Sequence, residues 1–109
     1  MVKRAYVVTT TADVIERYLE NHVHVHKDEL VLAVDNHFGE GWFRHNYINR
    51  AIDDMVNEGN ILLQEGLYYA RLNTLQHEKL LSLACDNATP KQVRKMAFEE
   101  VIKRMSRTD

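Results

Sequence analysis

The sequence predicts an α+β, mainly helical fold: three helices, a small three-stranded antiparallel sheet and further helices at the C-terminal end. Three observations lead to this prediction. Apolar residues recur at helical spacing in several segments, one histidine-valine stretch alternates with the period of a strand, and two runs of strand-forming residues flank a Glu-Gly pair. The chain has 109 residues, 45% of them hydrophobic and 28% charged, which is typical of one globular unit.

The first two helices and a strand between them follow from local patterns. Thr10 and Asp13 have the spacing of an N-terminal capping box, and the apolar residues after them predict a helix over residues 11–21. A second helix is expected over residues 27–38, because its apolar residues recur at intervals of three and four. The segment 22–26 between them reads His-Val-His-Val-His, so we expect a short strand with both valines turned inward.

The third helix and a hairpin come next. From Trp42 to Glu58 the apolar residues form one stripe with polar residues opposite, which predicts an amphipathic helix. The following ILLQ-EG-LYYA predicts a tight β-hairpin in which Gly66 supplies the positive φ of the turn. Since successive side chains in a strand point to opposite faces, one of Tyr68 and Tyr69 should be buried and the other exposed.

The C-terminal part divides from the rest at about residue 73. We expect one domain over residues 1–73 and a helical extension over 74–109, with helices in LQHEKLLSLACD and KQVRKMAFEEVIKRM. Their apolar residues exceed what the first domain needs for its core. The extension is therefore expected either to form a homodimer or to fold back on its own body. Cys85 lies within the apolar pattern, which predicts a buried small residue.

Composition limits the class of protein. The formal charge is −2, so positive potential does not cover the molecule; from Lys91 onward six basic residues face three acidic ones, which leaves −5 on residues 1–90. One cysteine excludes a disulfide framework and favours a reducing compartment. No apolar run approaches the length of a membrane span, and the N-terminal residues lack the core of a signal peptide. We expect a cytoplasmic protein without contact to membranes.

The predicted elements follow the order helix, short strand, helix, turn, helix and hairpin, with extra helices at the end. This order resembles a winged helix-turn-helix domain of the transcription-regulator type. The resemblance covers about residues 10–72 and is carried by KDELVLAV and INRAIDDMVNEGNILLQEGLYYARL. In this family the recognition helix ends in an apolar run through a glycine into the wing, and the residues at those places are Ile48, Ile52, Met55, Gly59 and Ile61. The resemblance implies that the helix over 43–58 lies in the major groove of double-stranded DNA.

The side chains in the first half of that helix suit such a role. Arg44 can form a bidentate contact with guanine, whereas Asn46 and Asn49 can pair with adenine. Arg50 can reach a base or a phosphate, and His45 can donate to a phosphate. Further positive charge would come from two residues outside the helix, Lys27 and Arg71. The same polar residues would also suit an ordinary solvated helix face.

Other features favour a different partner. Asp53, Asp54 and Glu58 make the second half of the helix acidic, and the hairpin tip contains Glu65 where many wings carry a basic residue. An acidic wing fits a basic protein better than a phosphate backbone. The alternative prediction is therefore a winged-helix adaptor that binds another protein and no DNA.

A metal-responsive regulator is a third hypothesis. His22, His24 and His26 would project from one face of the predicted strand, and neutral imidazoles bind zinc, nickel or copper. Solvent-exposed histidines on a packed strand explain the same pattern, so we expect no metal and no cofactor. The sequence contains no recognisable nucleophile, paired-carboxylate or phosphate-loop motif, and we expect no enzymatic activity.

Overall fold

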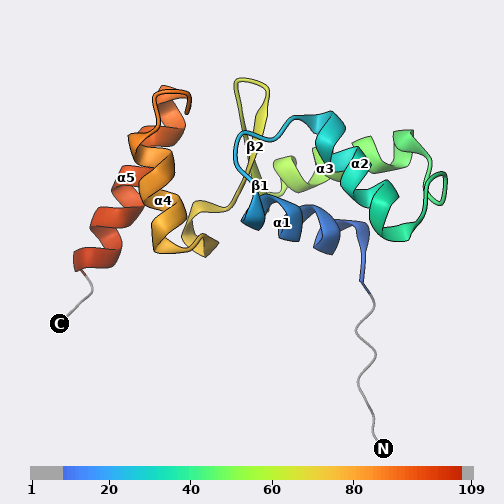
Figure 1. The fold of residues 1–109 in the computed structure, drawn as a ribbon, viewed down its shortest axis with the longest axis horizontal. Helices are drawn as coiled ribbons and strands as arrows, with labels where there is room; N and C mark the ends of the chain where they lie inside the picture. The colour runs from blue at the N-terminus through green and yellow to red at the C-terminus, as the bar shows by residue number, and fades with distance from the viewer. Residues whose placement is uncertain (1–8, 107–109) are drawn as a thin grey trace, which may run out of the picture.

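The computed structural model describes residues 9–106 and contains five α-helices, one short 3-10 helix and a two-stranded sheet. Two groups of helices lie on either side of the β-hairpin (Figure 1). One group consists of the first three helices and the other of the last two. The elements are α1 (Thr11–Asn21), α2 (Lys27–Phe38), α3 (His45–Asn57), β1 (Ile61–Gln64), β2 (Leu67–Ala70), η1 (Leu72–Thr74), α4 (His77–Cys85) and α5 (Lys91–Ser106).

Helix α1 begins where the capping pattern predicted. The Thr10 hydroxyl accepts the Asp13 backbone N–H at 3.2 Å, and the Asp13 carboxylate accepts the Thr10 backbone N–H at 3.0 Å. This reciprocal pair satisfies two of the backbone donors left open at a helix start. Ile15 and Leu19 bury the apolar face of α1 against α2 and α3. The predicted bounds of α1 and α2 are both confirmed.

Helix α3 is shorter than predicted at its start. Residues 39–44 form a turn, with the Trp42 backbone N–H donating to the Gly39 carbonyl at 3.0 Å, and Arg44 has extended dihedrals at the N-cap position. Gly39 has a φ of 109°, which explains why the chain leaves the helical path there. Trp42 was expected to begin the helix, but it lies in the preceding turn, and its side chain is 72% exposed.

The predicted three-stranded sheet is reduced to two strands and a single bridge. β1 and β2 pair antiparallel around the predicted turn, and Val25 joins them only through an isolated bridge to Tyr68, whose N–H donates to the Val25 carbonyl at 2.8 Å. His24 has a φ of 57°, a left-handed conformation that interrupts any strand. The alternation therefore fails: Val25 is fully buried, but Val23 is 39% exposed.

Strand β2 is covered on both faces. Tyr68 and Tyr69 are both buried, which contradicts the expectation that one would face solvent. The reason is tertiary: the hairpin lies between the two helical groups (Figure 1), so no face of β2 is left open. Burial, helped by the charges of Glu65 and Asp86, raises the pKa of Tyr69 to about 12.

The C-terminal helices form a hairpin that is anchored to the body. Leu80, Leu83 and Val101 belong to the same buried apolar cluster as the residues of α1 to α3. Arg104 donates to the carbonyls of Leu72 and Asn73 at 3.4 and 3.2 Å, and its Nε donates to Glu100 at 3.1 Å. The chain after residue 73 therefore folds onto the body through η1.

Cys85 is exposed at the C-terminal end of α4, so the expectation of burial is wrong. Over residues 9–106, no helix has the length and apolar content that crossing a membrane requires.

Candidate nucleic-acid interface

The outward face of α3 is exposed over its first half. Arg44, Asn46 and Arg50 are exposed, and Asn49 is half-buried. The opposite face of α3 fixes this orientation, because its apolar residues Ile48, Ile52 and Met55 are buried in the core. One helix thus brings together five of the residues that the sequence suggested for DNA contact: Arg44, His45, Asn46, Asn49 and Arg50.

His45 is held by a neighbouring helix. Its Nε2 lies 2.9 Å from a carboxylate oxygen of Asp35 on α2, and the Asp35 side chain is 9% exposed. This contact fixes the first turn of α3 against α2 and occupies one of the two imidazole nitrogens. A phosphate contact by His45, as expected from the sequence, would have to use Nδ1.

Lys27 has an acidic partner on α3. Its Nζ lies 2.9 Å from Asp53, and this hydrogen bond is the main cause that raises the pKa of Lys27. The pair reduces the negative charge in the second half of α3, where Asp54 and Glu58 remain exposed. The carboxylate of Asp53 thereby neutralises the positive charge of Lys27 beside the helix.

Arg71 lies away from the other candidates. It follows β2 at the base of the hairpin, where it lines a small pocket with Glu16 and Glu20 of α1. The hairpin tip is at the other end of the strands, and there Glu65 is exposed with a φ of 51°. The structure therefore groups the α3 residues and places Arg71 in an acidic setting.

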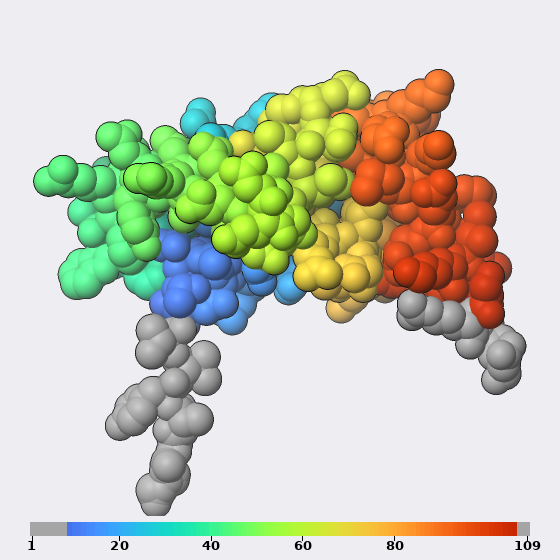
Figure 2. All heavy atoms as spheres, turned by 180° about the vertical axis from the view of Figure 1, so that it is seen from behind, coloured from blue at the N-terminus to red at the C-terminus, as the bar shows by residue number. Residues whose placement is uncertain are grey.

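The C-terminal helices leave the outward face of α3 uncovered. In the view from behind, the green to yellow-green surface of α3 and the hairpin faces the reader, and the orange and red helices lie beside it (Figure 2). The exposure of Arg44, Asn46 and Arg50 agrees with this view. A long partner such as a nucleic-acid duplex could therefore approach α3 without displacing α4 or α5.

Sequence reasoning missed an aromatic group at the start of α3. Phe43 stacks on Tyr47 with ring centroids 5.2 Å apart and meets Phe38 edge-on at 5.0 Å. Tyr47 is 53% exposed, so it and the exposed Trp42 extend the surface of α3 toward the turn. Gly39 and Gly41 mark a turn in the sequence, and that signal could have placed Trp42 outside the helix.

The three histidines of segment 22–26 do not converge. His22 hydrogen-bonds the Tyr18 carbonyl at 2.9 Å, whereas His24 hydrogen-bonds the buried Thr89 hydroxyl at 3.0 Å. His26 is the N-cap of α2, and its backbone N–H donates to Glu29. Within the described part of the chain, no group of three or more His, Cys, Asp or Glu residues is arranged to hold a metal ion.

Comparisons with known protein families, with curated proteins and with solved structures find no match to this chain.

Proposed function

We propose that the chain is a winged-helix protein that binds double-stranded DNA, as a small transcriptional regulator, with the first half of α3 in the major groove. The observation that carries this proposal is the uncovered outward face of α3, with Arg44, Asn46 and Arg50 exposed on a helix whose other face is locked into the core. The order of α1, the Val25 bridge, α2, α3 and the β-hairpin supports it, since it is the order of a winged helix.

The electrostatics of α3 suit a duplex at its N-terminal end. Its first turn contains no acidic residue, and no side chain caps it. The backbone N–H groups of such a turn, together with the helix dipole, favour a nearby phosphate. Arg44 and Arg50 add two cations, and the Lys27–Asp53 ion pair limits the repulsion from the acidic half.

A homodimer through the C-terminal helices is part of this proposal. Phe98 and Ile102 are 58% and 47% exposed and lie one helical turn apart on α5, and Leu81 of α4 is 41% exposed. Exposed large apolar side chains such as Phe98 and Ile102, one turn apart on α5, are typical of an interface. A two-fold dimer would present two copies of α3 to half-sites about 34 Å apart on DNA.

Binding of fluorescently labelled random duplex DNA, measured by anisotropy at about 50 and 200 mM salt, tests the proposal. Each phosphate contact contributes about 0.9 to the slope of log affinity against log salt. The Arg50→Ala variant should therefore bind more weakly and lose about 0.9 of slope per protomer. Lys103→Ala is the matched control, because it removes an exposed cation from α5.

The two variants separate DNA binding from general charge effects. Equal losses in Arg50→Ala and Lys103→Ala would mean that net charge and not α3 governs binding. No binding of duplex at low salt would refute the proposal and leave the protein-binding adaptor as the remaining hypothesis. Circular dichroism of both variants should give the wild-type spectrum, which would show that neither change unfolds the protein.

A further inference from the structure

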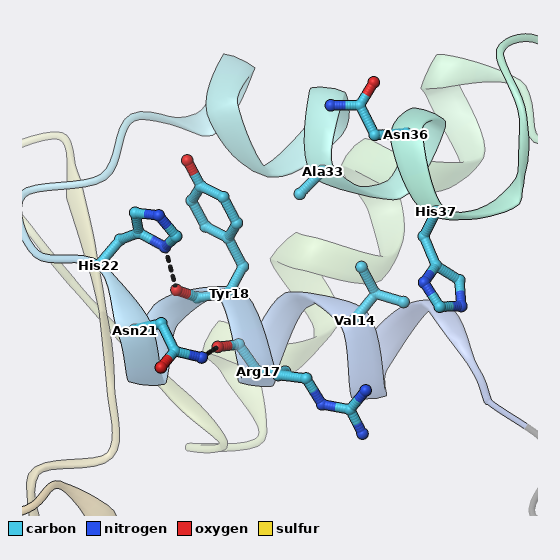
Figure 3. Close-up of a pocket in the computed structure, with 8 residues that line it drawn as sticks. All are labelled: Val14, Arg17, Tyr18, Asn21, His22, Ala33, Asn36 and His37. Carbon is cyan, nitrogen blue, oxygen red and sulfur yellow. Dashed lines mark hydrogen bonds between the residues drawn. The ribbon is translucent and has the colours of Figure 1, made fainter.

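An open groove of about 380 Å³ lies between α1 and α2 (Figure 3). Val14 and Tyr18 of α1 and Ala33 of α2 supply its apolar lining. The Tyr18 ring stacks on His22 with centroids 3.9 Å apart and an interplanar angle of 13°, so one wall is flat and aromatic. A wall of this kind favours a planar ligand.

One end of the groove carries hydrogen-bond donors from both helices. Figure 3 shows the His37 imidazole reaching from α2 toward α1 beside Val14, and the Arg17 side chain running along the lower edge of α1 below Val14. Arg17 offers a fork of N–H donors suited to a carboxylate, and an imidazole keeps at least one N–H donor in either protonation state. The exposed amide of Asn36 lines the same groove.

Several carboxylates of these two helices are engaged or line other pockets. Asp13 is used by the capping box, and both oxygens of Glu29 accept hydrogen bonds, from the Tyr18 hydroxyl at 3.3 Å and the His26 backbone N–H at 3.0 Å. Glu16 and Glu20 line pockets on another side of α1. Among residues 9–106, the groove lining contains no acidic residue, although the chain as a whole is acidic.

The far end has a different chemistry. The Nδ1 of His22 lies 2.9 Å from the Tyr18 carbonyl, which can only accept, so Nδ1 carries the hydrogen and Nε2 of the neutral ring is left as an acceptor. Asn21 donates to the Arg17 carbonyl at 2.9 Å. The groove is thus asymmetric, with the guanidinium of Arg17 as the cation of its described lining and a hydrogen-bond acceptor on His22 at the other end.

We propose that this groove binds a small aromatic carboxylate, with its acid group between Arg17 and His37 and its ring against Tyr18. The site is separate from the exposed face of α3 and does not depend on DNA binding. The groove is open, so a minimal ligand such as benzoate should bind with a dissociation constant on the order of 1 to 10 mM.

The test is a titration of the full chain with benzoate, followed by amide chemical shifts in ¹⁵N–¹H spectra. Shifts should concentrate in residues 14–22 and 33–37. Benzamide, which has the same ring without the charge, and inorganic phosphate, which has charge without the ring, should each bind at least tenfold more weakly. Arg17→Met keeps the length of the side chain and should weaken benzoate binding about tenfold or more.

Lys103→Met on α5 is the control for loss of a surface cation and should leave benzoate binding unchanged. Unchanged spectra of the wild type with benzoate would overturn the proposal. Equal affinities for benzoate and benzamide would show that the groove does not recognise the carboxylate charge. Equal affinities for benzoate and phosphate would show that it does not recognise the aromatic ring. If Arg17→Met binds as tightly as wild type while its spectrum shows a folded protein, the assignment of Arg17 is wrong.

Discussion

Alkaline pH should destabilise the protein through Tyr69 between about pH 10 and pH 12. Folding raises the pKa of this phenol from 10.0 to about 12, chiefly by burial. The unfolded chain therefore loses the proton as pH rises through 10, while the folded chain keeps it until about pH 12. The stability that Tyr69 contributes is complete below pH 10 and is lost as pH rises through the folded pKa.

The size of the effect follows from the shift. Each pKa unit corresponds to about 1.4 kcal/mol, so the free energy of unfolding should fall by roughly 2 to 3 kcal/mol from this group. Lys27, Lys79 and Tyr18 also have shifted pKa values and titrate in the alkaline range. Comparison with Tyr69→Phe isolates the contribution of Tyr69 ionisation to stability, because the variant keeps the aromatic ring but has no hydroxyl to ionise.

Urea unfolding followed by circular dichroism, from about pH 9 to pH 12, measures both proteins. Over this pH range the free energy of unfolding of the wild type should fall by roughly 2 to 3 kcal/mol more than that of Tyr69→Phe. If the stability of both proteins falls equally with pH, the reasoning is refuted, because the Tyr69 hydroxyl would then be reached by water in the folded protein.

Three other outcomes are expected. Ile52→Ala should lower the free energy of unfolding by about 2 to 4 kcal/mol in a urea titration, because Ile52 is fully buried; a loss below about 1 kcal/mol would show that α3 is not locked to the core. Phe98→Glu should convert a dimer to a monomer in light scattering, and an unchanged mass would argue against the α5 interface. Trp42, the single tryptophan, should show solvent-exposed emission that changes when duplex DNA binds; emission typical of a buried indole would contradict its exposure.

The elements that the sequence predicted best have strong local signals. The capping box at Thr10 and the apolar spacing after it define α1, and the Glu65–Gly66 pair defines the hairpin turn. The apolar stripe of α3 also sufficed to decide which face is buried. These features depend on residues close together in the sequence, so periodicity and turn chemistry are enough to find them.

The features that were missed depend on tertiary contacts. The left-handed conformation of His24 breaks the expected strand, and its imidazole reaches Thr89 far along the chain. Tyr69 is buried because the hairpin lies between the two helical groups, where His24 meets its ring edge-on. Two other features could not be predicted from any single segment, because they depend on how the helices pack side by side. They are the ion pair of Lys27 with Asp53 and the groove between α1 and α2.

The most direct test of the central claim is a map of the DNA-binding surface in solution. Amide chemical shifts of the ¹⁵N-labelled protein, recorded as a short duplex is added, should change most in residues 44–50 and at the turn before them. Changes confined to α4 and α5, with residues 44–50 unaffected in the bound protein, would contradict the claim that α3 contacts the duplex.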